Sequence, residues 1–315
     1  MNRKRMPSMS HQGLEPVYGA INVPLAIFWA KPDQEKTCRD LSCQAAADTA
    51  AWTEKLTIDE RLWLYGKVDT MALYGERVAI LEHQGDWLRV AAVSQRTIQN
   101  PLGYPGWIPA GQIALNDNYL KEQFNLKNVA VTVPKTPLVK NDGLDNPHCF
   151  LSYQTRLPLL DEKDSSLEVR LPDGTCGVLS GHEAKKTSQL SFSGLTIVGE
   201  ARRFLGLPYL WGGTSGWGFD CSGFMFRLYQ SQGIAIPRDA SEQAATGGAV
   251  QKENLQPGDL LFFAKDRLAE KIHHVGMYVG NGQMIHSPNS KSVIRIESYE
   301  AGIYGEEYWG ARRYC

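Results

Sequence analysis

The pattern of apolar residues changes near residue 191, and this change limits the folds that the chain can adopt. Before it, short runs with apolar residues at alternate positions follow one another closely, as in ERVAILEH, DWLRVAAV and GYPGWIPAGQI. After it, LTIVGEARRFLGL has helical periodicity, and helix and strand patterns then alternate. The sequence therefore predicts small antiparallel barrels followed by an α+β domain.

The strand-rich part contains two stretches with the same plan. DWLRVAAVSQ with GYPGWIPAGQI, and later SLEVRLPDGTCGVLSGHE, each contain a strand, a turn, a glycine-led strand and a short tail. Residues 32–62 instead contain helix formers, with Thr57 or Asp59 as the cap of a helix start. We therefore predict a first barrel with a helical insertion at 16–122, a second barrel at 123–190 and the α+β domain at 191–315.

The charge and the cysteine content argue against several classes of protein. The net charge is −1 and no basic run is interleaved with aromatic residues, so we expect no nucleic-acid partner. Six cysteines among 315 residues, with no C-x-x-C pair, argue against a zinc ribbon, a thioredoxin-type redox site and a disulfide-built scaffold. We expect reduced thiols, no metal and no cofactor.

The N-terminal sequence differs from a secretory signal. NRKR supplies positive charge, but SMSHQGLEPVYG is polar, and the apolar stretch VPLAIFWA comes late and contains proline. No stretch reaches the roughly 18 consecutive apolar residues of a membrane span. We expect a cytoplasmic monomer without membrane contact. Export to the cell wall is the alternative, if a signal preceded this sequence.

A single cysteine follows a glycine-rich run. GGTSGWGFD precedes Cys221 and supplies backbone that a substrate can approach closely, while GFMFRLYQSQGI fits a helix that ends at Gly233. Cys221 then lies in the first turn of this helix, where the helix dipole favours the thiolate, which is the reactive form. Cys221 is therefore a candidate nucleophile. A small buried hydrophobic residue is the alternative.

Two histidines follow in a predicted β-hairpin, KIHHVGMYVGNGQMIHS. If the loop centres on Asn281, His274 and His286 become diagonal neighbours on one face, whereas a slip of one residue separates them. His286 would then orient the ring of His274, the candidate base. His273 is the competing candidate, on the opposite face. A Cys-His-His zinc site from the same residues lacks an evident fourth ligand.

Five motifs of the last domain resemble the NlpC-type family of cell-wall cysteine peptidases. The likeness covers residues 191–315 and is carried by P-Y-L-W-G-G at 208–213, F-D-C-S-G-F at 219–224, L-Q-P-G-D-L-L-F-F at 255–263, H-V-G-M-Y at 274–278 and M-I-H-S at 284–287. The resemblance implies a papain-like core with Cys221 as nucleophile, His274 as base and His286 as the third polar residue. It also implies stem peptides of peptidoglycan as substrates.

The first 190 residues narrow this resemblance. Two bacterial SH3-like barrels before such a domain, with L-Y-G-E at 73–76 and G-Y-P-G-W-I-P at 103–109, are similar to the γ-D-glutamyl-L-diamino acid endopeptidases of the dipeptidyl-peptidase VI type. That likeness implies cleavage of the γ-D-glutamyl-meso-diaminopimelate bond in murein peptides with a free N-terminal L-Ala. Such cleavage belongs to cell-wall peptide recycling. Lysine in place of diaminopimelate stays open.

The resemblance also implies residues that hold the substrate's free amine. Asp220 would supply a carboxylate, and Tyr104 with an acid of the first barrel would complete the pocket. Glu76 is the predicted acid, and Asp69 is the alternative. Asp239 matches a family position near the substrate. Three of these residues also have a purely structural interpretation. Asp220 and Asp239 could each be a helix cap, and Tyr104 could be a packing aromatic residue.

Two further residues complete the predicted site. Ser222 would offer its hydroxyl or its backbone N–H to the substrate, and Tyr209 would donate to the oxyanion together with the Cys221 N–H. Three alternative functions are compatible with the same sequence features. These are an exported wall hydrolase whose barrels bind intact peptidoglycan, a non-catalytic wall-binding protein, and an amidase or transpeptidase with the same nucleophile.

Overall fold

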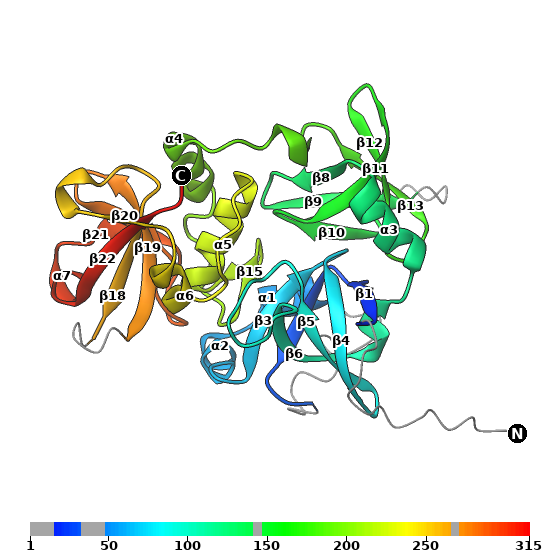
Figure 1. Cartoon of the computed structure of the whole chain (residues 1–315), viewed down its shortest axis with the longest axis horizontal. Coiled ribbons are helices and arrows are strands. Elements are labelled where there is room, and N and C mark those ends of the chain that lie inside the picture. Colours follow the sequence, from blue (N-terminus) through cyan, green and yellow to red (C-terminus); the bar gives the residue numbers. More distant parts are fainter. Residues whose placement is uncertain (1–15, 33–47, 141–146, 266–270) are drawn as a thin grey trace, which may run out of the picture.

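The computed structural model describes residues 16–32, 48–140, 147–265 and 271–315. Figure 1 shows two strand-rich bodies, coloured blue to cyan and green, beside an α+β domain coloured yellow to red. The fold class predicted from the sequence is therefore confirmed. Much of the expected helical insertion, at 33–47, lies outside the described residues. Within the described ranges, no helix is long and apolar enough to cross a membrane.

The first barrel is an antiparallel sheet with the strand order β3-β2-β6-β5-β4-β1-β7. Its strands are β1 (Tyr18–Ile21), β2 (Leu25–Trp29), β3 (Val68–Leu73), β4 (Arg77–Gln84), β5 (Trp87–Ala92), β6 (Tyr104–Pro109) and β7 (Ile113–Ala114), with a short 3₁₀ helix at Ala110–Gln112. The insertion contributes α1 (Thr49–Lys55) and α2 (Ile58–Trp63). Thr57 caps α2 in a capping box with Glu60, as one of the two predicted caps.

The second barrel repeats this topology, with the order β10-β9-β13-β12-β11-β8-β14. Its strands are β8 (Asn128–Val131), β9 (Lys135–Lys140), β10 (Cys149–Ser152), β11 (Arg156–Lys163), β12 (Ser166–Arg170), β13 (Cys176–Ser180) and β14 (Ala184–Lys186), followed by a 3₁₀ helix at Thr187–Gln189. Adding seven to each strand number of the first barrel reproduces this order, so the two barrels are related as predicted. Helix α3 (Asp117–Asn125) runs across the predicted boundary at 122/123.

The α+β domain has a sheet with the order β17-β22-β18-β19-β20-β21. Its strands are β17 (Gly248–Val250), β18 (Leu260–Ala264), β19 (Ile272–Gly280), β20 (Gln283–His286), β21 (Arg295–Ser298) and β22 (Tyr308–Arg313). A small hairpin, β15 (Thr214–Ser215) and β16 (Gly218–Phe219), precedes the central helix. The helices are α4 (Gly194–Arg202), α5 (Cys221–Ser231), α6 (Ala240–Ala245) and α7 (Gly302–Glu307), with a 3₁₀ turn at Lys252–Asn254. Helices α5 and α6 both pack on β19.

The three domains share hydrophobic clusters. Leu210 and Trp217 of the α+β domain are buried in one cluster with strands β2 and β3 of the first barrel. Tyr153 of the second barrel belongs to the core of the α+β domain, and its hydroxyl donates to Glu200. Tyr74 of the first barrel belongs to the core of the second. Each pair of domains is therefore joined by buried apolar surface, which favours a fixed arrangement.

The glycine-rich run before Cys221 serves this domain packing. A Cβ atom on Gly216 would overlap the carbonyl oxygen of Pro134 in the second barrel. A side chain at Gly212 would press on Val68 of the first barrel, 2.7 Å away. The expectation that these glycines open the backbone to a substrate is thus corrected at both positions, because barrel residues occupy the space.

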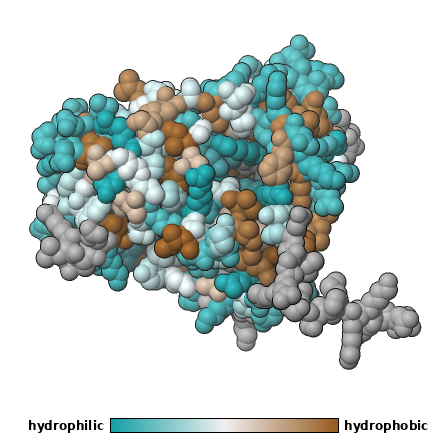
Figure 2. Space-filling view, in the orientation of Figure 1, coloured by the Kyte–Doolittle hydropathy of each residue, from teal (hydrophilic) through white to brown (hydrophobic). Residues whose placement is uncertain are grey.

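Exposed hydrophobic residues are scattered over the surface. Among the large hydrophobic residues that the structure describes, Ile98, Phe124 and Leu195 are the most exposed, and they lie in three different parts of the chain. Figure 2 shows several separate hydrophobic patches among hydrophilic residues on the face it presents. This face therefore offers no continuous apolar surface to a partner.

Candidate active site

The hairpin of β19 and β20 has the register that the sequence predicts. Tyr278 pairs with Met284 and Met277 with Ile285, and the same register places Gly276 opposite His286. His274 is therefore the diagonal neighbour of His286 on one face. A Cβ atom on Gly276 would lie only 3.2 Å from the Cβ of His286, so the glycine leaves room for this ring.

The two histidines of this face are hydrogen-bonded. His274 Nε2 lies 2.7 Å from His286 Nδ1, and both side chains are buried. Burial lowers the pKa of His286 to about 3. Burial, with the neighbouring His286 and His273, also holds the pKa of His274 well below its usual range. Both imidazoles are therefore neutral at pH 7. His273 instead pairs with Glu307 at 2.9 Å on the other face.

A carboxylate that the sequence analysis did not select continues this chain of contacts. Glu297 Oε1 lies 2.7 Å from His286 Nε2 and also accepts a hydrogen bond from Arg295 Nε at 2.8 Å. Strand β21 pairs with β20, with Arg295 opposite His286. Arg295 and Glu297 alternate on the strand that follows the hairpin, and this alternation is the sequence signal that could have indicated Glu297.

Cys221 is the first residue of α5 and is partly exposed. Because α5 packs on β19, the backbone of Val275, next to His274, hydrogen-bonds to the Cys221 sulfur. The ring of Tyr304 packs against both histidines, with its centroid 5.7 Å from that of His274 and 5.0 Å from that of His286. The structure thus brings the predicted cysteine and both predicted histidines together.

The protonation of Cys221 differs from the expectation. Burial and the neighbouring Asp220 carboxylate raise the pKa of this thiol to about 12, although hydrogen bonds from Val275 and Ser222 and the charge of Arg238 lower it. The helix start alone predicted a thiolate, but desolvation outweighs it in the folded protein. The resting pair is therefore a thiol beside a neutral imidazole, which can transfer a proton during attack.

Asp220 caps α5 and is paired with a buried arginine. Its Oδ1 accepts from the backbone N–H of Gly223 at 2.6 Å and from the Ser222 hydroxyl at 3.2 Å. Arg238 Nη2 lies 2.5 Å from Asp220 Oδ2, and Arg238 Nη1 donates to Ser222 at 2.9 Å. Asp220 is thus a helix cap, and its carboxylate is paired with Arg238. Its contact with the substrate amine stays a prediction. Ser222 donates within the same group.

The loop between β5 and β6 attaches the first barrel to α6. The backbone N–H of Arg238 donates to the carbonyl of Arg96 at 3.0 Å, and Thr97 donates to Glu242 at 2.9 Å. These contacts connect the first barrel with the arginine that holds Asp220. The barrel therefore lies next to the residues that precede Cys221.

Two carboxyl groups and a tyrosine gather at this junction. Asp239 is the N-cap residue of α6, but its side chain makes no cap bond and instead accepts from the Tyr104 hydroxyl at 3.0 Å. Asp69 of β3 lies nearby. Burial and the charge of Asp239 raise the pKa of Asp69 to about 6, and burial also raises the pKa of Asp239. We call Asp69, Tyr104 and Asp239 the acid cluster.

Comparison with known proteins identifies the family of this chain. The NlpC/P60 family model matches residues 206–313, and the model of the YKFC SH3b2 domain matches residues 131–186. A γ-D-glutamyl-L-lysine dipeptidyl-peptidase of Bacillus cereus (strain ATCC 10987) is 41% identical over 300 residues, which cover 93% of this chain and 90% of the relative. The chain belongs to the NlpC/P60 family.

Other relatives agree with this assignment. A protein of the same name from Bacillus subtilis (strain 168) is 36% identical, over 92% of this chain and 96% of its own length. A crystal structure of an NlpC/P60 family protein from Bacillus cereus ATCC 10987 superposes with a TM-score of 0.90 at 40% identity, covering 94% of this chain and 99% of the other. This NlpC/P60 protein is therefore a cysteine peptidase.

Glu76 lies outside the acid cluster of the NlpC/P60 protein. Its Oε1 lies 2.5 Å from Nη1 of the buried Arg227 on α5, and its Oε2 accepts from the backbone N–H of Leu73 at 3.1 Å. Asp69, the alternative acid, lies beside Asp239, whereas Glu76, the first choice, pairs with Arg227 and joins the first barrel to α5. This placement favours Asp69, and the contact of either residue with the substrate amine stays a prediction. Asp69 lies on β3 and Glu76 in the turn between β3 and β4, and the two residues have different neighbours.

Replacing Glu76 with glutamine should lower the free energy of unfolding by about 3 kcal/mol, because the buried guanidinium of Arg227 loses its charged partner. Denaturant unfolding followed by circular dichroism measures this change. The matched control is Glu82→Gln, because Glu82 is an exposed glutamate 4.0 Å from Arg89. That control should cost less than about 1 kcal/mol. Equal stability of the two variants would mean that the Glu76–Arg227 pair does not stabilise the domain junction.

Tyr209 lies close to Cys221 and Asp220, in keeping with its predicted place. Burial and these two neighbours raise its pKa well above the usual value, so its hydroxyl stays protonated and can donate. Its side chain is buried, and its backbone N–H donates to Ser292 at 3.0 Å. The oxyanion role itself stays a prediction.

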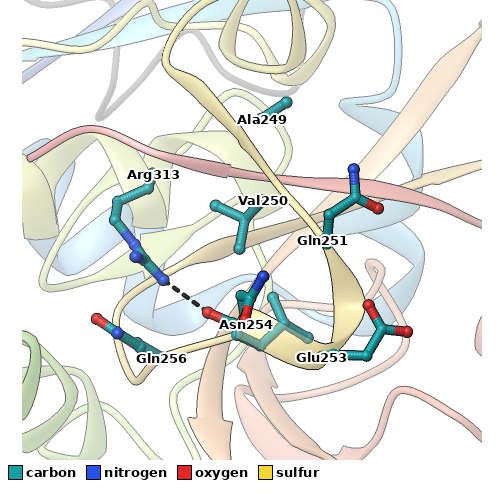
Figure 3. Close-up of a pocket in the computed structure, with 8 residues that line it drawn as sticks. Ala249, Val250, Gln251, Glu253, Asn254, Gln256 and Arg313 are labelled. Atoms are coloured by element: carbon teal, nitrogen blue, oxygen red, sulfur yellow. Dashed lines mark hydrogen bonds between the residues drawn. The ribbon is translucent and has the colours of Figure 1, made fainter.

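A cavity elsewhere in the NlpC/P60 domain contains none of these residues. Figure 3 shows this cavity of about 630 Å³, lined by residues 249–251, 253–256 and Arg313. Arg313 donates to the Asn254 carbonyl at 2.9 Å and pairs with Asp259 at 2.7 Å, so its guanidinium is already occupied. Cys221 and the hydrogen-bonded pair of His274 and His286, rather than this cavity, therefore define the candidate site.

Proposed function

We propose that the protein hydrolyses the bond between D-Glu, through its γ-carboxyl, and an L-diamino acid in short murein peptides with a free N-terminal L-Ala. L-Ala-γ-D-Glu-meso-diaminopimelate is the model substrate. The acid cluster carries this proposal, because the first barrel and α6 hold two carboxyl groups and a hydroxyl near the residues that precede Cys221. Such a group suits a desolvated ammonium.

The names of the two Bacillus relatives support the bond and leave the diamino acid open. Both are γ-D-glutamyl-L-lysine dipeptidyl-peptidases. A dipeptidyl-peptidase releases two residues from the amino end, which agrees with a pocket for the free amine two residues before the cleaved bond. Lysine and diaminopimelate share the attacked bond and differ in one side-chain carboxylate, so both belong in the test.

Cys221 attacks the γ-carbonyl carbon of D-Glu. His274 takes the thiol proton as the sulfur forms its bond to carbon, because both groups are neutral at rest. The developing oxyanion accepts hydrogen bonds from the Tyr209 hydroxyl and the Cys221 backbone N–H. Attack by a neutral thiol requires this proton transfer, so the raised pKa of the partly exposed Cys221 is compatible with catalysis.

The second half of the reaction returns the enzyme to its resting form. The imidazolium of His274 gives its proton to the leaving amine of the diamino acid, and the C–N bond breaks. The acyl group remains on Cys221 as a thioester. Water, which gives a proton to His274, attacks the thioester, and the C–S bond breaks. His274 returns that proton to the Cys221 sulfur, and L-Ala-D-Glu leaves with a free γ-carboxylate.

A requirement for a free L-Ala amine points to a role in recycling. In intact peptidoglycan this amine is acylated by the lactyl group of muramic acid, so the acid cluster would admit only peptides already detached from the glycan. We therefore propose a cytoplasmic enzyme of murein peptide recycling. The rival, an exported hydrolase that binds intact wall through its barrels, would tolerate the acylated amine.

The test compares the free tripeptide with its N-acetylated form, in lysine and diaminopimelate versions, by mass spectrometry of the products. We expect kcat/KM to fall at least about 10²-fold on acetylation, because a buried charged pocket is left without its partner. Binding to purified sacculi distinguishes the rival. Equal rates on both forms, or release of products from sacculi, would contradict the proposed function.

A further inference from the structure

We propose that Glu297 is a positioning residue that sets the tautomers of His286 and His274. The inference deepens the proposed function and rests on the roles given there to Cys221 and His274. It arises from the contact of Glu297 Oε1 with Nε2 of the buried His286, which the hairpin motifs alone did not indicate. Glu297 does not need to contact the substrate for this role.

The order of hydrogen bonds determines where each proton lies. An ionised carboxylate only accepts, so the bond between Glu297 Oε1 and His286 Nε2 places a proton on that nitrogen. A neutral imidazole has one N–H, so His286 Nδ1 must accept. Its partner at 2.7 Å, His274 Nε2, must then carry the proton. His274 Nδ1 is left with a free lone pair.

This tautomer is the one that can act as a base. The Nε2 atom of His274 is engaged by His286, so Nδ1 is the nitrogen that remains to accept the Cys221 proton. If His286 carried its proton on Nδ1, it would donate to His274 Nε2. His274 would then hold its proton on Nδ1 and could not accept another there. One contact at Glu297 therefore decides the direction of two hydrogen bonds.

Glu297 is itself held in place. Arg295 Nε and Nη2 both contact the oxygen that faces His286, at 2.8 and 2.7 Å, and Arg295 Nη1 donates to Ser292 at 2.8 Å. Two donors from arginine require an acceptor at that position. A glutamine at 297 would therefore place its carbonyl oxygen there, and its NH₂ group on the outer side.

A purely structural role makes a different prediction. Glu297 and Arg295 form an ion pair in which both side chains are about one third exposed or more. Such a pair contributes little to stability, so its loss would change neither tautomer nor kcat if stability were its whole purpose. The positioning role and the purely structural role of Glu297 therefore predict different values of kcat and different positions of the imidazole protons.

The experiment compares Glu297→Ala, Glu297→Gln and Glu297→Asp with wild type, and uses Glu300→Ala as the control. Glu300 is a nearby exposed glutamate paired with Lys252. Kinetics on the free tripeptide give kcat and KM. Long-range ¹H–¹⁵N spectra of protein with ¹⁵N-labelled histidine report which ring nitrogens of His274 and His286 carry protons, without any substrate.

We expect Glu297→Ala and the shorter Glu297→Asp to lower kcat about 10²-fold with KM within about twofold, since the substrate contacts are intact but the base is partly in the wrong tautomer. Glu297→Gln should stay within about tenfold of wild type, because its carbonyl keeps the proton on His286 Nε2. In the spectra, the His286 proton should leave Nε2 in the alanine and aspartate variants and remain in the glutamine variant. Glu300→Ala should match wild type in both measurements.

Unchanged kcat in the aspartate variant, or a His286 proton that stays on Nε2 in it, would overturn the inference. The aspartate variant keeps the negative charge, so it tests whether Glu297 sets the tautomers even if the alanine variant does not fold. Failure of the proposed function looks different. If wild type cleaves none of the tripeptides, the spectra still show whether Glu297 sets the tautomers.

Discussion

Replacing Cys221 with alanine should reduce kcat on L-Ala-γ-D-Glu-meso-diaminopimelate by about 10⁴-fold or more, because every covalent step passes through its sulfur. The sulfur lies at the start of α5, beside the strand that carries His274. Only binding and any oxyanion stabilisation would remain in the variant. Single-turnover measurements with mass-spectrometric detection of L-Ala-D-Glu give the residual rate.

The matched control is Cys315→Ala, which removes an exposed thiol at the end of the chain. Its kcat should equal that of wild type within about twofold, which is within ordinary surface effects. His274→Ala should resemble the Cys221 variant, since a neutral thiol without a base does not attack. If Cys221→Ala retained a tenth of the wild-type rate, this result would contradict the assignment of Cys221 as the nucleophile.

Replacing Asp69 with asparagine should abolish most of the preference for a free L-Ala amine. We expect kcat/KM on the free tripeptide to fall about 10²- to 10³-fold, while the slow rate on the acetylated tripeptide stays within about threefold, since loss of one partner of a buried charge pair costs several kcal/mol. The measured quantity is the ratio of the two kcat/KM values. Glu76→Gln is the control and should leave this ratio unchanged, because Glu76 pairs with Arg227.

The same residue predicts a pH dependence. The pKa of Asp69 is raised to about 6, so the carboxylate that we propose as a partner of the ammonium is present above pH 6 and is lost as the pH falls through that value. Because kcat/KM reports the free enzyme, its acid limb for the free tripeptide should lie near pH 6. Asp69→Asn should remove this limb. If the acid limb of kcat/KM were unchanged in Asp69→Asn, the limb would arise from the titration of another group.

Stability does not confound this test. A carboxyl whose pKa is raised above its unfolded value favours folding in its protonated form, and this contribution is lost as the pH rises from about 4 to about 6. Asp69 therefore does not stabilise the fold at pH 8, and Asp69→Asn should melt at the same temperature as wild type or higher. A loss of activity with a lower melting temperature would instead indicate misfolding.

Features set by neighbouring residues were predictable from the sequence. The turn at Gly280 to Gly282 and the alternation along β19 sufficed for the register that joins His274 to His286. The capping box of Thr57 and Glu60 is likewise local. The repeated plan of the two barrels appeared in the order of strands and turns, because each barrel is built from consecutive hairpins.

Features set by domain contacts were not predictable in this way. Asp69 and Glu76 look alike in sequence, and their difference comes from Asp239 and Arg227, which lie more than 150 residues later. The raised pKa of Cys221 depends on how deeply α5 is buried against β19. A helix start indicates where a thiol lies, but the protonation of that thiol follows from the whole fold.

The cluster that joins Leu210 and Trp217 to the first barrel has a consequence for damaged molecules. The barrel supplies Asp69, and the same barrel packs against the segment that leads to Cys221. A molecule whose barrel is detached by heat or proteolysis would therefore lose its discrimination and its activity together. Under the proposed function, loss of the barrel would thus inactivate the enzyme and would not turn it into an unselective peptidoglycan hydrolase.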